Sequence, residues 1–391
     1  MALKGTNQEF GRPYNRRIVL ETIRQYGPIA RGEIAARVGL TVQTVSNITR
    51  ELEDQDFLLG TRNSKRVRGY PATSLSINPA GGYAIGLNLT PIGIEAALVN
   101  LAGEIVASRS RGRNCLKPER AFREIATMIA DFKALKPGKR LLGVGLAMPG
   151  PYDVESMSFV GPTTLEGWKD IPITERLAEI ADCPVFGEVD HAAAALGERL
   201  YGAGKNHKDY YYLFFSMGLG GCMVHDGLPI RGSFNNAGEI GHVPIVPDGV
   251  PCPCGNRGCL ERYFSLEAFE RRSAEIGDEA WLKETAPIFR SAIATIENLF
   301  DPETIIIGGL SATDIPQRLL ALAEPLANSV SSRKDRIVPR IIFSTAGRDA
   351  ALRGAASLAI SGALTPRFGM MFNNDEADKP RDPLFNRGAA A

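Results

Sequence analysis

Apolar positions recur at helical spacing in three consecutive stretches near the start of the chain. The first stretch predicts a helix over residues 15–26, which a Gly-Pro pair ends. A shorter helix follows over residues 30–38, and Gly39 after it suits a left-handed C-cap. Thr41 is a suitable N-cap for a third helix over residues 42–57. Helix, short helix, Gly-containing turn and helix form the helix-turn-helix pattern.

The third predicted helix separates its apolar from its polar side chains. At about 100° per residue, one side collects a mainly apolar set, namely Val42, Val45, Ile48, Thr49 and Leu52. The opposite side collects polar residues, namely Gln43, Thr44, Asn47 and Arg50. Asn and Gln pair with adenine, and Arg pairs with guanine or phosphate. We therefore predict that the polar set enters the major groove of DNA.

Beyond this helix the pattern predicts two short strands around a basic loop. The loop holds Arg66 and Arg68, which we expect to contact the minor groove or the phosphate backbone. Residues 1–78 contain 12 Lys/Arg against 7 Asp/Glu, whereas the rest of the chain is mildly acidic. This asymmetry favours an anionic partner for the first part, and we predict double-stranded DNA. The alternative is an ordinary three-helix bundle with solvated charges.

From residue 79 the pattern changes to apolar runs separated by turn residues. It predicts a three-stranded meander, a helix, and further Gly-containing strand segments with helices between them (81–109, 118–135, 141–151, 211–227 and 304–312). Residues 366–391 are rich in Pro and charge without periodicity, which predicts a mobile tail. We therefore expect an α/β body over residues 79–365, preceded by the DNA-binding part over residues 1–78.

Composition limits the class of protein. The chain is 44% hydrophobic and 23% charged, which predicts a large core and excludes global disorder. The sequence has neither a secretory signal nor a run of about eighteen apolar residues, so we expect no export and no membrane partner. Six cysteines, three of them close together, fit a reducing cytoplasm.

One imidazole and three thiols lie close together in the sequence. His242, Cys252, Cys254 and Cys259 are the ligand set of a tetrahedral structural zinc, and two glycines let the backbone fold tightly between them. We predict Zn²⁺ as a structural cofactor of loop 242–259. The alternative is a loop with three reduced cysteines and no metal.

Six segments carry a family resemblance. They are AMPGP (147–151), EVDHAAAALGE (188–198), SMGLGG (216–221), NNAGEIGH (235–242), CPCGNRGCLE (252–261) and IIIGGL (305–310). With these segments in this order, the chain resembles repressors of the ROK family (repressors, open reading frames, sugar kinases). The resemblance implies a winged helix-turn-helix followed by an actin-like, sugar-kinase fold, in which two α/β lobes enclose a sugar-binding cleft.

The resemblance also implies which residues contact the sugar. Glu239, His242 and Glu261 match positions that bind sugar hydroxyls, and the histidine serves both the metal and the sugar loop. Asp190 matches the general base of the family's kinases. Its neighbours differ, because the family's Asn-Asp-Ala-Asn is replaced by Val189-Asp190-His191-Ala192. The alternatives are an N-cap role for Asp190 and surface solvation for the two glutamates.

Phosphoryl transfer is not expected from this chain. The family's kinases hold phosphate with an Asp followed by Gly-Gly-Thr, and the matching stretch here is Gly86-Leu87-Asn88-Leu89-Thr90-Pro91. The acid is an amide, the glycine pair is missing, and Pro91 lacks a backbone donor. We therefore predict a binding protein and not an enzyme.

Together these patterns predict a transcriptional regulator of carbohydrate genes, most simply a repressor. Two winged modules of a homodimer, or of a homotetramer, would bind an inverted-repeat operator, and a sugar or sugar phosphate would alter their spacing. Two alternatives remain open: an ATP-dependent sugar kinase with an appended DNA-binding domain, and an interaction protein without a small ligand. Trp168 would pack either against a sugar or in the core.

Overall fold

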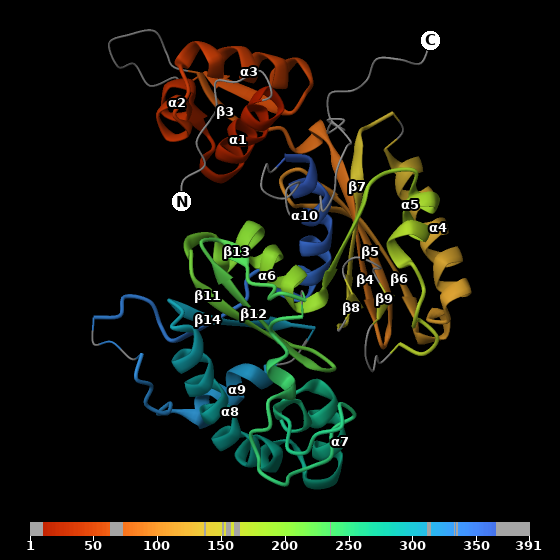
Figure 1. Cartoon of the computed structure of the whole chain (residues 1–391), viewed down its shortest axis with the longest axis vertical. Coiled ribbons are helices and arrows are strands. Elements are labelled where there is room, and N and C mark those ends of the chain that lie inside the picture. Colours follow the sequence, from red (N-terminus) through yellow and green to blue (C-terminus); the bar gives the residue numbers. More distant parts are fainter. Residues whose placement is uncertain are drawn as a thin grey trace.

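A computed structural model of the chain describes residues 11–62, 73–136, 138–150, 152–153, 158–159, 165–234, 236–310, 314–331, 333 and 335–364. Three parts follow one another along the chain: a small head and two larger lobes, with helices α6 and α10 between the lobes (Figure 1). Within the described residues, no helix is both long and apolar enough to cross a bilayer.

The head consists of three helices and a small antiparallel sheet of order β1-β3-β2; the helices and the last two strands confirm the prediction, whereas β1 was not predicted. Their bounds are α1 Gly11–Tyr26, β1 Ile29–Ala30, α2 Arg31–Val38, α3 Val42–Asp54, β2 Leu58–Arg62 and β3 Thr73–Ile77. Gly39 caps α2 in the left-handed conformation with φ 69°, and Thr41 Oγ1 accepts the Thr44 N–H at 3.1 Å.

Two predictions for the third helix were wrong. The helix ends at Asp54 instead of residue 57, because Asp56 has a φ of +63° and cannot continue a right-handed helix. Val42 was assigned to the buried side but is 54% exposed, because the buried stripe begins one turn later, at Val45. The rest of the predicted apolar side, through Leu52, is buried.

The first lobe is a five-stranded sheet of order β10-β7-β4-β5-β6, in which the meander is antiparallel and β7 and β10 are parallel to β4. Its strands are β4 Tyr83–Thr90, β5 Gly93–Asn100, β6 Ile105–Gly112, β7 Leu141–Met148 and β10 Val185–Val189. One face is covered by α4 (Pro118–Leu135) and α5 (Ile173–Ala181), and the other by α10 (Ala350–Leu364) (Figure 1). A two-stranded hairpin, β8 Tyr152–Asp153 and β9 Ser158–Phe159, follows β7.

The second lobe is a five-stranded sheet of order β13-β12-β11-β14-β15 with helices on its outer side. Its elements are β11 Tyr210–Phe215, β12 Leu219–His225, β13 Leu228–Pro229, α7 Leu266–Ile276, α8 Asp278–Phe300, β14 Thr304–Gly309, α9 Ile315–Ala323 and β15 Ile341–Phe343. The predicted Gly-rich segment at 211–227 is the β11–β12 hairpin.

Helices α6 (Asp190–Tyr201) and α10 cross between the lobes in close backbone contact. A Cβ on Gly197 would lie 2.2 Å from the Ala350 carbonyl oxygen, and one on Gly354 would lie 1.7 Å from that of Ala193. Only glycine fits at these positions, so the two helices pack as one unit. The pair of α6 and α10 therefore joins the two lobes, and a conformational signal between the lobes must pass through it.

The head packs against the body through a continuous apolar core. Buried residues of α1 and α3 belong to the same hydrophobic cluster as residues of β4, β5 and α10. At its edge the Arg140 guanidinium lies 4.3 Å from the centre of the Phe57 ring, the residue between α3 and β2. The head is therefore seated on the first lobe and not merely tethered to it.

A charged cluster is buried at the same junction. Glu21 of α1 pairs with Arg24, whose Nε lies 2.8 Å from Glu21 Oε2, and both side chains are about one-tenth exposed. Arg199 and Tyr201, at the end of α6, approach this pair. Burial lowers the pKa of Arg199, which the charge of Glu21 opposes, and burial raises the pKa of Tyr201 to about 12. The end of α6 thus lies within electrostatic range of the DNA-binding part.

Candidate functional site

The predicted metal ligands converge in space. One ligand atom from each of His242, Cys252, Cys254 and Cys259 lies within 4.8 Å of the other three. Cys252 Sγ is 3.6 Å from His242 Nδ1, and Cys254 Sγ is 3.6 Å from Cys259 Sγ. Around a tetrahedral zinc, two sulfurs lie about 3.8 Å apart, and a sulfur and a nitrogen about 3.6 Å apart. These four residues, called the metal cluster below, therefore fit a four-coordinate metal.

The backbone between the ligands has little regular structure to hold it. Within residues 243–258 only two isolated β-bridges form, Pro244 with Cys259 and Pro251 with Arg257. Gly258 adopts a φ of +73°, and a Cβ there would lie 1.7 Å from the Val246 carbonyl oxygen. This close approach brings Cys259 back beside the segment that follows His242, as the sequence pattern predicted for these glycines.

Beside the metal cluster lies a group of acidic side chains, called the carboxylate site below: Asp190, Glu239 and Glu261, with His191 and His242. It forms where the carboxyl ends of β7 and β10 face the turn between β11 and β12. A Cβ on Gly150, just after β7, would lie 3.1 Å from Glu239 Oε1, so the first lobe closes over a residue of the second. The structure brings together all four residues predicted to bind sugar.

Glu239 is the least satisfied of these carboxylates. Burial raises its pKa, an effect that the charges of Asp190 and Glu261 add to and that His191 and His242 oppose. Its Oε2 lies 3.9 Å from His242 Nε2, and among the described residues no group donates a hydrogen bond to it. A half-buried carboxylate without donors is suited to accept hydroxyl groups from a ligand.

His242 faces both sites at once. Its Nδ1 lies toward Cys252 Sγ in the metal cluster, while its Nε2 lies toward Glu239. A metal on Nδ1 would fix the ring orientation and leave Nε2 directed into the carboxylate site. This geometry supports the dual role that the family resemblance implied for this histidine.

Glu261 is anchored to the backbone, which argues against surface solvation. Its Oε2 accepts the Leu219 N–H at 2.9 Å, at the start of β12. A Cβ on Gly218 would lie 2.6 Å from the same oxygen. The glycine therefore makes room for the carboxylate, and the carboxylate fixes the turn between β11 and β12.

Asp190 is the first residue of α6, one position inside the N-cap, which is Val189. Its Oδ1 accepts the His191 N–H at 2.7 Å, and its side chain is about one-fifth exposed. Among the described residues Oδ2 has no partner, so one oxygen remains for a ligand. The N-cap alternative for Asp190 was therefore wrong.

The sequence pattern did not predict the role of His191, whose side chain is only 4% exposed. Its Nδ1 lies 3.5 Å from Asp190 Oδ1 and its Nε2 lies 3.4 Å from the Ala237 carbonyl oxygen. Burial lowers its pKa, but the hydrogen bond and charge of Asp190, together with the charge of Glu239, raise it above the ordinary value. His191 thus bridges α6 and the segment before Glu239. The sequence signal for this role was that His191 replaces the alanine of the family's motif.

Trp168 belongs to the core of the first lobe. It is 1% exposed, its ring packs 5.5 Å from that of Phe122, and its Nε1 donates to the Leu116 carbonyl oxygen at 2.7 Å. The core alternative was therefore correct, and this side chain offers no surface to a sugar.

Asn88 occupies the position where the family's kinases hold an acid. It is 1% exposed on β4, and its Nδ2 donates to Glu95 at 3.3 Å. Among the described residues its Oδ1 has no hydrogen-bond partner. The side chain lies inside the first lobe as a neutral group, so this position offers no carboxylate for a cation and its phosphates.

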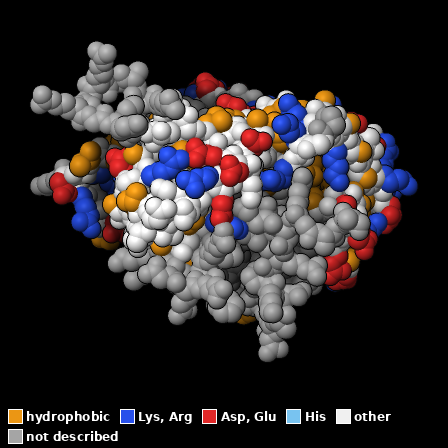
Figure 2. All heavy atoms as spheres, turned by 90° about the horizontal axis from the view of Figure 1, so that it is seen from above, with side chains coloured by type: hydrophobic (Ala, Val, Ile, Leu, Met, Phe, Trp, Pro, Cys, Tyr) orange, Lys and Arg blue, Asp and Glu red, His pale blue; other side chains and the backbone are white. Residues whose placement is uncertain are grey.

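The polar side of α3 is free of packing against the rest of the head. Gln43, Asn47 and Arg50 are exposed and Thr44 is half-buried, and the Gln43 amide donates to Asn47 Oδ1 at 3.1 Å. The predicted wing contacts, Arg66 and Arg68, lie outside the described residues. Seen from above, onto the head, lysine and arginine side chains are interspersed with acidic ones (Figure 2). On this face the described basic charge is therefore distributed and not one continuous patch.

Comparison with known proteins finds a matching family for each part of the chain. The model of the MarR family matches residues 17–66, and that of the ROK family matches residues 84–361. The xylose repressor of Bacillus subtilis is 27% identical over 375 residues, covering 90% of this chain and 97% of the repressor. The DNA-binding transcriptional dual regulator NagC of Escherichia coli is 26% identical over 358 residues, covering 83% and 86%.

Solved structures confirm the predicted fold class. A ROK family transcriptional regulator, described as a homolog of the E. coli Mlc protein, superposes with a TM-score of 0.73 at 23% identity, over 93% of this chain and 99% of that one. A ROK family glucokinase from Streptomyces griseus, in complex with glucose and AMPPNP, gives 0.62 at 26% identity, over 72% and 100%. Because the ROK family model matches well over half of its length, the chain belongs to the ROK family.

Proposed function

We propose that this chain is a sugar-responsive, DNA-binding transcriptional regulator, and that sugar relieves its repression. The observation that carries the proposal is the combination in one chain of a MarR-type head, whose α3 exposes its polar side, and a ROK body with a carboxylate site. The similarity to named repressors over most of the chain supports the same combination. Residues 1–78 are the DNA-binding domain and residues 79–365 the effector domain; the predicted tail, 366–391, lies outside the described residues.

The ligand is a neutral monosaccharide held by its hydroxyl groups. Asp190, Glu239 and Glu261 are acceptors, and vicinal hydroxyls are donors that can reach two carboxylate oxygens at once. His242 Nε2 adds a further contact. Burying a sugar leaves its polar rim unsatisfied unless each hydroxyl is paired, at a cost of about 1–3 kcal/mol per group. The free oxygens of Asp190 and Glu239 support this assignment.

The metal cluster binds Zn²⁺ as a structural brace. Glu239 precedes the ligand His242 by three residues, and Glu261 follows the ligand Cys259 by two. Zinc would supply rigidity and no reaction chemistry, because four protein ligands complete its coordination. With the metal bound, the two carboxylates are held at a fixed separation.

The sugar signal travels along α6. This helix begins with Asp190 and His191 in the carboxylate site and ends with Arg199 and Tyr201 beneath the head. Because α6 packs on α10 without side chains between them at Gly197 and Gly354, a shift at one end moves the other. In a homodimer or homotetramer this shift changes the spacing of two α3 helices on an inverted repeat.

Side chains of α3 read the operator sequence. Asn47→Ala and Arg50→Ala should each weaken operator binding by about 1–3 kcal/mol, because both exposed side chains are placed to contact base edges. Val42, exposed at the start of α3, is placed to contact a thymine methyl group. Fluorescence anisotropy with the DNA upstream of the chain's own gene measures the effect. A Lys205→Gln variant, exposed on the body, is the control, and unchanged affinity in both α3 variants contradicts the assignment.

A thermal-shift screen tests the sugar site. The panel contains D-xylose, D-glucose and N-acetyl-D-glucosamine, and at least one is expected to raise the melting temperature of the zinc-loaded protein. Glu239→Gln should weaken binding of that sugar about tenfold, since a charge-assisted hydrogen bond becomes a neutral one. Glu270→Gln, exposed on α7, is the matched control. A Glu239→Gln variant that binds as tightly as the wild type removes Glu239 from the site.

The kinase alternative draws support from the similarity to a glucokinase solved with glucose and AMPPNP. Against it stand the neutral Asn88 and the proline that follows the same strand. Mixing the protein with ATP and the same three sugars separates the two: we expect no ADP release above the sugar-free control. Sugar-dependent ADP release would establish the kinase.

A further inference from the structure

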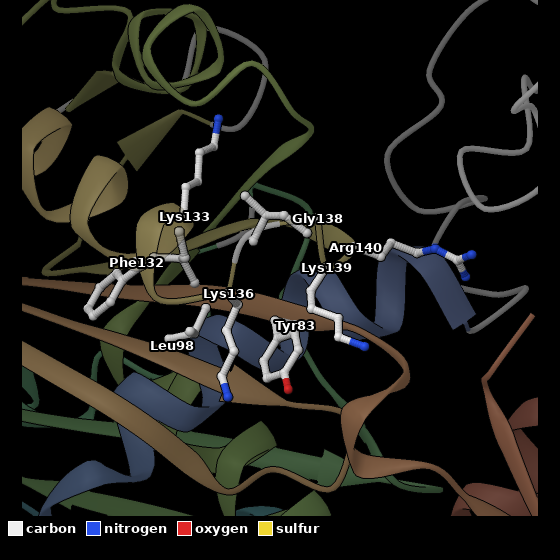
Figure 3. A pocket seen from close by; sticks show the side chains of 10 residues that line it. Tyr83, Leu98, Phe132, Lys133, Lys136, Gly138, Lys139 and Arg140 are labelled. Carbon is white, nitrogen blue, oxygen red and sulfur yellow. The ribbon is translucent and has the colours of Figure 1, made fainter.

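A cavity lies at the opposite end of the first lobe from the carboxylate site. It forms where β4 and β7 begin, beside the C-terminal end of α4, and has a volume of about 250 Å³ (Figure 3). The sheet and α4 give it an apolar floor of Ile85, Leu98, Phe132 and Leu141. Asp190 and Glu239 lie beyond the other ends of these strands, so the two sites are separate.

The rim of this cavity is cationic. Lys133, Lys136, Lys139 and Arg140 all line it, and none of its ten lining residues is acidic. Two of these cations are held by residues outside the cavity: Lys133 Nζ donates to the Ala181 carbonyl oxygen at 2.7 Å, and the Arg140 guanidinium stacks on Phe57. Among the described residues the Lys136 ammonium contacts only the ring of Tyr83, which itself lines the cavity, so Lys136 and Lys139 supply the positive charge that is available to a ligand.

Tyr83 completes the arrangement. Its side chain is 6% exposed, and the Lys136 ammonium lies 5.6 Å from the centre of its ring. Among the described residues its hydroxyl makes no hydrogen bond. Figure 3 shows the side chains of Tyr83, Lys136 and Lys139 extending to the same side of the cavity. Two ammonium groups and one hydroxyl are thus placed around one opening above an apolar floor.

We propose that this cavity binds a small organic phosphate. The phosphate would accept hydrogen bonds from Lys136, Lys139 and the Tyr83 hydroxyl, and the carbon skeleton of the ligand would lie on the apolar floor. Charge-assisted hydrogen bonds to phosphate are about twice as strong as neutral ones, and an acid-free rim opposes none of them. The cavity is slightly smaller than the roughly 300–1,000 Å³ of typical ligand sites, which limits the ligand to a compact metabolite.

Occupancy of the cavity is positioned to affect the head. Arg140 both lines the cavity and stacks on Phe57, and its carbonyl oxygen accepts the Tyr83 N–H at 2.9 Å. A phosphate drawn to Lys139 and Tyr83 therefore sits beside the contact between head and body. We expect it to change operator affinity independently of the sugar. This consequence rests on the proposed function, whereas binding itself does not.

Calorimetric titration of the full-length, zinc-loaded protein tests the proposal. The probes are AMP, D-glucose 6-phosphate and inorganic phosphate, so a nucleotide source is distinguished from a sugar phosphate source. We expect saturable binding of AMP or glucose 6-phosphate, and weaker binding of inorganic phosphate, which has no carbon skeleton. Lys136→Gln with Lys139→Gln should weaken binding about tenfold or more. Lys205→Gln with Lys208→Gln, exposed on the body, is the matched control and should leave affinity unchanged.

Three results overturn the proposal. The first is that neither organic phosphate binds saturably at millimolar concentration. The second is that inorganic phosphate binds as tightly as both organic phosphates. The third is that the Lys136/Lys139 variant keeps the wild-type affinity. Tyr83→Phe serves as a second variant, because it removes only the hydroxyl, and it should weaken binding several-fold with an unchanged melting temperature. Since none of these titrations uses operator DNA or a neutral sugar, their outcome does not depend on whether the proposed function holds.

Discussion

Cys254→Ser is expected to lower the zinc content from about one ion per chain to nearly none and to abolish the response to sugar. Structural zinc contributes about 10–16 kcal/mol of apparent binding free energy in small zinc-finger peptides, and a hydroxyl does not replace a thiolate ligand. Residues 243–258 form no helix or strand, and turn hydrogen bonds such as that from the Gly258 N–H to the Val250 carbonyl oxygen at 2.9 Å are what holds this loop without metal. Elemental analysis after dialysis against a chelator measures the metal.

The matched control is Cys183→Ser. Cys183 is half-buried and is not part of the metal cluster. It should keep the wild-type zinc content and sugar response. Because Glu239 and Glu261 lie on either side of the zinc ligands, loss of metal should weaken sugar binding before it unfolds the body. Wild-type protein without zinc, or a Cys254→Ser variant with full zinc and full response, contradicts the bracing role.

Glu21→Gln should destabilise the protein by about 3–5 kcal/mol, the typical effect of removing one partner of a buried ion pair. Glu21 is the acid that faces Arg24, and its charge also stabilises the buried Arg199 of α6. Without it, two arginines remain buried at the junction of head and body. The free energy of unfolding in urea measures the effect.

The control for this variant is Glu270→Gln, which is exposed on α7 and makes no ion pair among the described residues. It should lie within about 0.5 kcal/mol of the wild type. If Glu21→Gln also falls within that range, the cluster does not hold the head on the body. A variant that stays folded at low temperature should bind operator but lose most of its response to sugar.

The parts of the fold that depend on neighbouring residues could be predicted from sequence. Gly39, Thr41 and the apolar spacing of α3 act over one or two helical turns, and the three thiols of the metal cluster lie within eight residues of one another. The prediction that α3 extends to residue 57 was wrong because the spacing does not reveal the left-handed conformation of Asp56. Patterns of this kind report periodicity and not backbone dihedral angles.

Contacts between distant residues could not be predicted in the same way. The burial of Trp168 against Phe122 and the approach of Arg199 to Glu21 depend on how whole elements pack. The role of His191 could not be predicted, because it depends on Ala237, 46 residues away. The predicted contacts of Arg66 and Arg68 stay predictions, since these residues lie outside the described part of the chain.

We propose above all that a sugar bound in the carboxylate site changes the affinity for operator DNA on α3, and that bound operator changes the affinity for the sugar. Operator affinity is measured by anisotropy with and without the sugar found in the thermal-shift screen, and sugar affinity by calorimetry with and without operator. We predict that both affinities fall by the same factor, corresponding to about 1–3 kcal/mol of coupling. Operator affinity that is identical with and without saturating sugar contradicts it.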